Sequence, residues 1–173
     1  SGRPKNTSGS CVACLMEGSR PILAEVQALV SSSCYGNPRR MTNGFDYNRL
    51  AMLAAVLEKR AGFFLSNCDI YINVVGGLKL DEPASDLSVA LSLISSLKDT
   101  PIRDDVIAFG EIGLGGEIRS IGSCEQRIKE AARLGFNRCI VPYHNYKNLN
   151  SNIKSLVEIV PARTIRAAFD SAI

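Results

Sequence analysis

Several motifs of nucleotide-driven and metal-dependent enzymes are missing from this sequence. It has no GxxxxGK loop followed by Ser or Thr, and no GxGxxG after a strand-like run, so we expect that the chain is not itself an ATPase. Its single CxxC motif, from Cys11 to Cys14, has neither a second CxxC nor a histidine pair downstream to complete a zinc site. We therefore expect no metal site and no cofactor in this domain.

Histidine is also scarce. The only one, His144, lies in a polar stretch after a proline, where a surface position is expected. A histidine-dependent catalytic triad would also need an acidic partner, which the sequence does not place. We therefore assign no catalytic role to His144.

Long apolar runs are absent as well, and none approaches the length of a membrane span. The first residues are polar, unlike a signal peptide. These features predict a soluble intracellular protein without membrane contact, in the bacterial cytoplasm or, if the source is eukaryotic, in an organelle or the nucleus. The formal net charge of +3 is small, so a nucleic-acid site would have to come from local clustering of basic residues.

The chain has 173 residues, 46% of them hydrophobic, which suits one well-packed domain. The first ten residues have the Ser, Gly and Pro content of a linker, so we expect a linker over residues 1–10 and a single domain over residues 11–173. Several of the six cysteines lie in apolar runs, where a small thiol packs well, and we expect free thiols.

Residues 69–98 are the centre of the predicted fold. A β-branched run over residues 70–75 predicts a strand covered on both faces, and Gly76 and Gly77 predict a turn. Pro83 suits the first turn of a following helix. Apolar residues recur at helical spacing in that helix, namely Leu87, Ala90, Leu91, Ile94 and Leu97.

The segments before this centre predict an antiparallel beginning. Residues 11–16 and 21–30 are apolar and are joined by a turn at Gly18, which predicts a hairpin. Residues 31–44 have the composition of a long loop. Asp46 can cap a helix that runs to about Arg60, with Gly62 just past its end.

The segments after it alternate between strand and helix. Strands are expected over residues 106–109, 138–141 and 156–160, and the glycines of residues 110–119 predict a tight hairpin more than a phosphate cradle, because no helix follows directly. Ser123 and Gln126 form a predicted capping box, and the face of Cys124, Ile128, Ala131 and Leu134 is expected to be buried. A last helix is expected from Pro161 to about Ala172. This order predicts an α/β fold with partly parallel pairing.

Charged residues give two further expectations. The carboxylate pairs Asp81–Glu82 and Asp104–Asp105 are expected to be solvated. Single basic residues are also expected to be solvated, but a shared face would form a phosphate-binding surface with salt-dependent affinity. The basic residues in question are Arg39, Arg40, Arg49, Lys59, Arg60, Lys79, Arg119 and Arg127.

Five stretches, in order along the chain, resemble one family. They are LMEGSRPILAEVQALV, NPRR followed by NGFDYNRLAMLAAVLEKRAG, DIYINVVGGLKLDEPASDLSVALSLISS, FGEIGLGGEIRSIGSCEQRIKEAARLGF and IVP. Together they resemble the C-terminal domain of the RadA/Sms family of DNA repair and recombination proteins. The resemblance runs from about residue 11 to the end.

The resemblance implies a Lon proteolytic-domain-like fold, also called ribosomal protein S5 domain 2-like, with a mixed sheet and flanking helices in the α/β (α+β) class. It further implies a hexameric, ATP-driven DNA branch-migration protein whose upstream parts, a zinc-binding element and a RecA-like ATPase, would hold the Zn, ATP and Mg. This chain would then supply self-association, as a homohexamer, and DNA contact. The candidate DNA-binding residues are Arg39, Arg40, Arg49, Lys59, Arg60 and Lys79.

The same resemblance allows a comparison with active Lon proteases, which use a serine and a lysine. Ala84 stands at the serine position and Glu125 at the lysine position. Ser85 is turned by about 100° around the helix and Lys129 lies about 6 Å along the axis, so neither replaces the missing partner. We expect an inactive protease fold; the alternatives are an active serine-lysine peptidase and a ring-forming scaffold without DNA contact.

Overall fold

The computed structural model describes residues 7–34 and 36–173 of the chain. Residues 1–6 of the expected linker lie outside these ranges, and the first strand begins at Ser10. The division into linker and domain remains a prediction.

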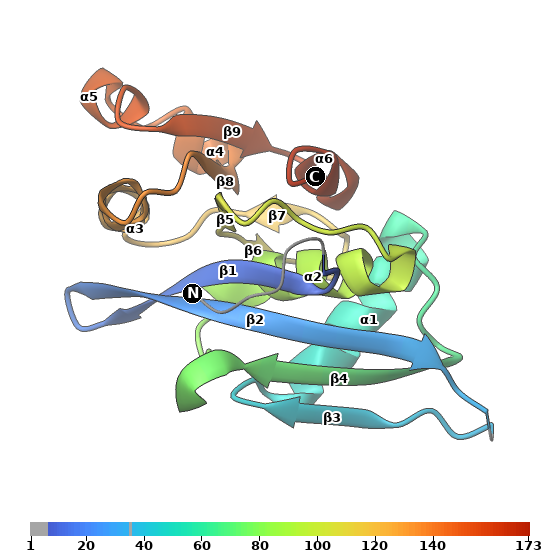
Figure 1. Cartoon of the computed structure of the whole chain (residues 1–173). Coiled ribbons are helices and arrows are strands. Elements are labelled where there is room, and N and C mark those ends of the chain that lie inside the picture. Colours follow the sequence, from blue (N-terminus) through green and yellow to red (C-terminus); the bar gives the residue numbers. More distant parts are fainter. Residues whose placement is uncertain (1–6, 35) are drawn as a thin grey trace.

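In the described part of the chain, seven strands form one mixed sheet in the order β3-β4-β2-β1-β5-β8-β9 (Figure 1). The pairs β1–β2 and β2–β4 are antiparallel, and the other neighbours are parallel. The expected α/β fold with an antiparallel beginning is thus confirmed. The strands are β1 (Ser10–Glu17), β2 (Arg20–Ser32), β3 (Arg40–Asn43), β4 (Cys68–Val74), β5 (Val106–Ala108), β8 (Arg138–Pro142) and β9 (Glu158–Ala162).

The expected glycine-rich hairpin is also confirmed. Its strands, β6 (Glu111–Ile112) and β7 (Ile118–Arg119), pair antiparallel with each other. The helices are α1 (Tyr47–Ala61), α2 (Asp86–Lys98), α3 (Cys124–Arg133), α4 (Tyr143–Tyr146), α5 (Ser151–Lys154) and α6 (Ile165–Asp170), with 3-10 turns η1 (Val75–Gly77) and η2 (Pro83–Ser85).

Helices cover both faces of the sheet around β1, β5 and β8. Along β5, Val106 and Ala108 pack with residues of α1, α2 and α6. Their neighbours Ile107 and Phe109 pack with residues of α3 and α5. Because successive residues of a strand point to opposite faces, these two clusters lie on opposite sides of the sheet.

Helix α2 is the central element of the larger cluster, as the sequence predicts. Every residue from Asp86 to Ser95 is buried, serines included. The serine hydroxyls bond to backbone groups of neighbouring elements: Ser88 donates to Ala108 O at 2.6 Å, and Ser95 accepts from Gly9 N at 2.8 Å. The helix can therefore be buried on all sides without leaving these hydroxyls unpaired.

The expected hairpin and first helix are confirmed. β1 and β2 join at Gly18, whose φ of 61° suits glycine. The Asp46 carboxylate accepts a hydrogen bond from Arg49 N at 2.9 Å and so caps α1, and Gly62 ends the helix with φ 78°.

The expectation that the strand of residues 70–75 is covered on both faces is wrong. In β4, Ile70 and Ile72 are buried, whereas Tyr71 is half-buried and Asn73 is exposed. In Figure 1, α1 and α2 lie behind β2 and β4, and none of the described helices covers the front of these strands. Val75, expected in the strand, follows it and is 40% exposed.

Part of the expected loop of residues 31–44 is strand. β2 continues to Ser32, and β3 pairs parallel with β4. The sequence Arg-Met-Thr-Asn of β3 lacks the alternation of apolar and polar residues by which a strand is predicted. This strand lies at the edge of the sheet, and its Met41 points away from the core, with 58% of its surface exposed.

The predicted capping box at α3 is wrong, although the helix is present. Ser123 has φ 58° and makes no side-chain cap bond. A capping serine needs an extended backbone to direct its oxygen toward the first helical N–H groups. Leu134, expected on the buried face, follows the helix and is 49% exposed.

The end of the chain also differs from expectation. β9 begins at Glu158 and contains Pro161, which was expected to start the last helix. Proline is tolerated there because β9 is an edge strand that pairs only with β8. α6 begins instead at Ile165, where the Thr164 hydroxyl accepts a hydrogen bond from Ala167 N at 3.1 Å.

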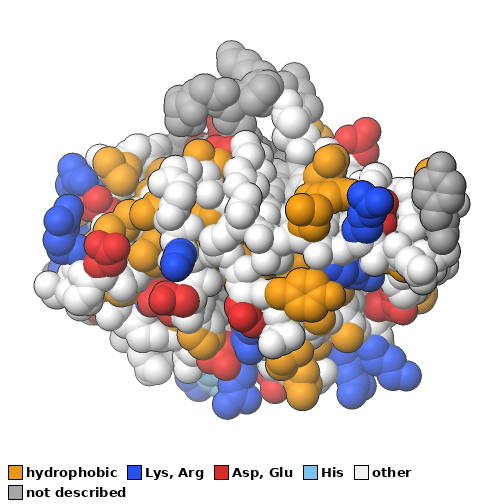
Figure 2. Space-filling model, turned by 90° about the horizontal axis from the view of Figure 1, so that it is seen from below, with side chains coloured by type: hydrophobic (Ala, Val, Ile, Leu, Met, Phe, Trp, Pro, Cys, Tyr) orange, Lys and Arg blue, Asp and Glu red, His pale blue; other side chains and the backbone are white. Residues whose placement is uncertain are grey.

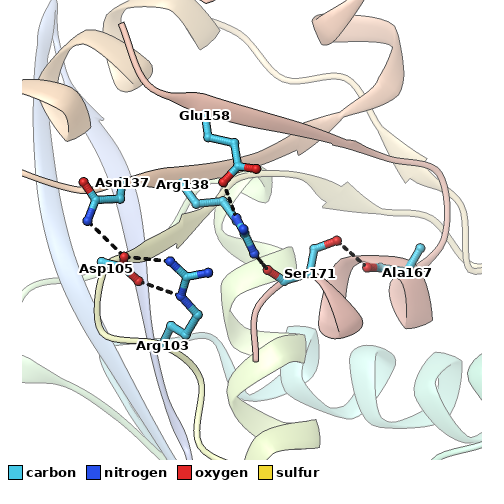
Figure 3. Close-up of polar contacts among 7 residues, drawn as sticks. All are labelled: Arg103, Asp105, Asn137, Arg138, Glu158, Ala167 and Ser171. Carbon is cyan, nitrogen blue, oxygen red and sulfur yellow. Dashed lines mark hydrogen bonds and ion pairs between the residues drawn. The ribbon is translucent and has the colours of Figure 1, made fainter.

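Polar side chains anchor this end of the chain to the parallel half of the sheet (Figure 3). Arg138 donates to Glu158 at 2.7 Å and to Ser171 O at 2.9 Å, which joins β8 to β9 and to the end of α6. Asp105, expected to be solvated, accepts two hydrogen bonds from Arg103, at 3.0 and 2.8 Å.

The cysteines are free, as expected, and only Cys34 among them is exposed. Within the described ranges, the structure has no helix with the length and hydrophobicity needed to cross a membrane.

Candidate functional site

The start of α2 is docked tightly against the residue that precedes β6. Ala84 O accepts a hydrogen bond from Gly110 N at 2.9 Å, and Leu87 N donates to Gly110 O at 3.0 Å. A Cβ on Gly110 would lie 2.9 Å from Ile118 Cγ2 and 3.3 Å from Leu87 Cβ. Glycine is therefore needed at this position, and the turn that would carry a nucleophile is rigidly held.

The two positions compared with the serine-lysine dyad carry no suitable chemistry. Ala84 is buried and offers only a methyl group. Glu125, in the first turn of α3, is a carboxylate in place of an amine, and its Oε1 accepts from Asn150 Nδ2 at 3.5 Å. Neither side chain can act as nucleophile and base in the manner of a serine-lysine pair.

The displaced candidates are not brought together either. Ser85 is completely buried, and its Oγ has no hydrogen-bond partner among the described residues. Lys129 lies one helical turn after Glu125 in α3 and is exposed to solvent. A buried hydroxyl and a solvated amine of this kind do not form an activated pair.

Arg127 belongs to α3, the helix that carries Glu125, and it is only 3% exposed. Its guanidinium pairs with Glu82, just before η2, and donates to Cys14 O of β1 and to Gly122 O, the latter at 3.0 Å. The expectations that Arg127 and Glu82 are solvated are thus wrong. A clue to this burial is present in the sequence, because Arg127 falls on the same helix face as Cys124 and Ala131.

A second buried ion pair holds the start of α2. Asp86 accepts hydrogen bonds on both carboxylate oxygens from Arg49 of α1, and a further one from Ile112 N at 3.0 Å. Burial raises the pKa of Asp86 above its usual value, while the Arg49 hydrogen bond opposes that change. The hydrogen bond to Asp86 also raises the pKa of Arg49. The pair therefore joins α1, α2 and the β6–β7 hairpin at one point.

The candidate DNA-binding residues are distributed over several elements. Arg39 is exposed before β3, while Arg40 donates to Leu65 O at 3.0 Å and lies near Glu58. Lys59 and Arg60 are exposed at the end of α1, and Lys79 is exposed in the loop after η1. Arg49 differs from these because its charge is balanced by Asp86.

Figure 2 shows the side of the molecule below the view of Figure 1, where β3 lies. The lysine and arginine side chains on this side form separate groups with acidic and apolar side chains between them. This side of the molecule therefore carries no single uniform basic face.

The uncovered face of β2, β4 and β3 carries a shallow depression of about 300 Å³. Leu29 and Met41, 60% and 58% exposed, and Tyr71 lie in its lining. Exposed apolar side chains that are grouped in this way are typical of contact surfaces between proteins. This surface was not predicted from the sequence, because the residues of β3 were expected in a loop and β4 was expected to be covered on both faces.

Potential metal ligands are dispersed. In residues 7–34 and 36–173, no three His, Cys, Asp or Glu side chains are grouped so that they could hold a metal ion. His144, expected at the surface, is exposed in α4.

Comparison with known proteins adds a family context. Residues 49–173 match the family model of the Lon protease (S16) C-terminal proteolytic domain. The chain is 52% identical over 143 residues to the DNA repair protein RadA of Bacillus subtilis, covering 83% of the chain and 31% of that protein. It is 47% identical over 169 residues to the DNA repair protein RadA of Halalkalibacterium halodurans, covering 97% of the chain and 36% of the relative. The chain thus spans about a third of the length of these relatives.

Proposed function

Because the chain belongs to the family of the Lon protease C-terminal proteolytic domain and is the Lon-like domain of RadA DNA repair proteins, we propose that it serves DNA repair as a noncatalytic domain that self-associates and binds DNA. The observation that carries the noncatalytic part is the pair Ala84 and Glu125 at the dyad positions. The buried Arg127–Glu82 pair supports it, because it links the same two segments by a structural contact.

The longer protein would be an ATP-driven motor for DNA branch migration. In this proposal its upstream parts hold ATP, Mg and Zn, and the present domain contributes no cofactor. Its role is to keep the subunits together, as a hexamer, and to contact the DNA that the motor moves.

Self-association would use apolar surface that the fold leaves open. The uncovered face of β2, β4 and β3 offers Leu29 and Met41 for this purpose. Burial of such side chains between subunits stabilises an oligomer by removing apolar area from water.

DNA contact would use the exposed basic residues. Arg39, Lys59, Arg60 and Lys79 are solvent-exposed and can reach phosphate groups, whereas Arg49 would first have to leave Asp86. Arg40 directly follows Arg39, is half-buried and donates to Leu65 O. We therefore place the first test on Arg39 and Arg40.

The double substitution Arg39→Ala/Arg40→Ala is expected to weaken binding to a labelled DNA duplex about tenfold at low salt, because two phosphate contacts are lost. The slope of log affinity against log salt should decrease by roughly 2 for the same reason. Fluorescence anisotropy at several salt concentrations measures both quantities.

A matched control is Arg20→Ala/Arg133→Ala, which removes the same charge from the β1–β2 turn and the end of α3. We expect this control to bind nearly as well as the wild type. Equal binding by the wild type and by Arg39→Ala/Arg40→Ala would show that the loop contact is wrong. Rings without any DNA binding would favour the purely structural scaffold.

A further inference from the structure

A hollow with a volume of about 400 Å³ lies between the end of α1, the β6–β7 turn and the segment that joins β9 to α6. Three arginines line it, Arg60, Arg163 and Arg166, and Glu117 is the only acidic residue in the lining. We call this feature the arginine groove. Only Arg60 belongs to the DNA-binding candidates discussed above.

Two of the three guanidinium groups are held in place by aromatic rings. The Arg163 guanidinium lies 3.7 Å from the centre of the Tyr143 ring, and that of Arg166 lies 4.5 Å from the centre of the Phe63 ring. Arg166 Nε also donates to Ala61 O at 3.0 Å. Stacking and this hydrogen bond restrict the side chains before any ligand arrives, so less conformational entropy is lost on binding.

The third arginine is positioned by the hairpin. Gly116 has φ 85°, and a Cβ at this position would lie 2.8 Å from Arg60 Cβ. The turn can approach Arg60 this closely only with glycine, and Arg60 Nε lies 3.4 Å from Leu114 O. The third guanidinium is thus brought to the hollow by a specific backbone conformation.

The positive charge of the arginine groove is not balanced within the described residues, where none of its three arginines takes part in an ion pair. Glu117 Oε1 accepts from Gly115 N at 3.0 Å, and Oε2 lies 3.5 Å from Arg119 Nη1. Its carboxylate is thus engaged by the hairpin itself. The groove contrasts with Arg49 and Arg127, whose charges are paired with Asp86 and Glu82.

We propose that the arginine groove is a phosphate-binding site. Planar guanidinium groups form paired hydrogen bonds with phosphate oxygens, and three of them around one hollow suit a phosphodiester or a pyrophosphate group. The phosphate belongs either to a nucleic-acid strand, in which case the inference rests on the proposed function, or to a small phosphate compound. Tyr143 and Lys147, whose Nζ lies 5.9 Å from the ring centre, extend the same basic and aromatic surface beyond the hollow.

The test uses the double variant Arg163→Gln/Arg166→Gln in the full chain. Glutamine keeps a polar side chain of similar reach, and a thermal melt checks that α6 remains folded. The charge-matched control is Arg20→Gln/Arg133→Gln, which leaves the groove intact. Two probes are used: a labelled single-stranded oligonucleotide of about 20 nucleotides, which spans the site sizes typical of single-strand binders, and inorganic pyrophosphate.

We expect the groove variant to bind the oligonucleotide about tenfold more weakly than the wild type and the control, with a salt slope lower by roughly 1 to 2. Pyrophosphate should shift the NMR signals of Nε–Hε in Arg163 and Arg166, and not that of Arg133.

The outcomes separate this inference from the proposed function. Unchanged oligonucleotide affinity together with no pyrophosphate shift would overturn the arginine groove, while the Arg39 and Arg40 result would stand independently. Absence of DNA binding by the wild type, together with pyrophosphate shifts of the Arg163 and Arg166 signals in the wild type, would contradict the proposed function and support a site for small phosphate compounds.

Discussion

Arg127→Met is expected to lower the free energy of unfolding by about 3–5 kcal/mol, because it leaves Glu82 and two backbone carbonyls without their partner. For a domain of this size, that corresponds to a melting temperature lower by roughly 10 °C. The substitution keeps an unbranched side chain, so cavity formation contributes little. Chemical denaturation with urea and a thermal melt measure the effect.

Arg133→Met provides the control on the same helix. Arg133 pairs with Glu130, but 67% of its side chain is exposed, so solvent screens the pair and the expected loss of unfolding free energy is small beside that of Arg127→Met. A double-mutant cycle with Glu82→Gln isolates the interaction between Arg127 and Glu82. Losses of the same small size in Arg127→Met and Arg133→Met would contradict a supporting role for the buried guanidinium.

Asp86→Ala is the second substitution with a large expected effect, again about 3–5 kcal/mol, since it removes one partner of a buried ion pair. It leaves Arg49 uncompensated and Ile112 N without an acceptor. The β6–β7 hairpin should loosen first, because that hydrogen bond attaches it to α2. Amide hydrogen exchange should therefore become faster at Ile112.

Asp105→Ala is the matched control for Asp86→Ala. Asp105 also accepts two hydrogen bonds from one arginine, but its side chain is 23% exposed against 1% for Asp86 (Figure 3). We expect a loss of about 1 kcal/mol there. Similar losses in the two variants would show that burial does not determine the strength of the Arg49–Asp86 pair.

Local pattern was sufficient to predict much of the fold. The β1–β2 hairpin, α1 with its Asp46 cap and α2 follow from apolar spacing and from residues that act over three or four positions. The two dyad positions, Ala84 and Glu125, came from the family resemblance. The hairpin and the two helices could be predicted because they depend mainly on residues that are close together in the sequence.

The failures have tertiary causes. Ser123 adopts a left-handed backbone, so its side chain cannot cap, although the residue pattern of a capping box is present. Pro161 lies in a strand because β9 has only one neighbour. β3 lacks apolar alternation because it lies at an edge with one open face. In each case the backbone conformation or the position of the strand at the sheet edge decides the structure, and the secondary-structure preference of the local sequence does not.

The polar contacts of the site could be predicted least. The partners in the Arg49–Asp86 and Arg127–Glu82 pairs lie far apart in the sequence. No local sequence pattern therefore predicts that these charges form ion pairs. The arginine groove is likewise lined by residues from three separate elements, namely the end of α1, the β6–β7 turn and the start of α6. Only the folded chain brings Arg60 and Arg163 to the same hollow.

Incubation of the chain with unfolded casein and fluorogenic peptides tests most directly the claim that the Lon-like framework is catalytically silent. With Ala84 and Glu125 at the dyad positions, and with Ser85 buried, the wild type and Ser85→Ala are both expected to show no hydrolysis above buffer. Hydrolysis by the wild type that disappears in a folded Ser85→Ala variant would contradict the claim.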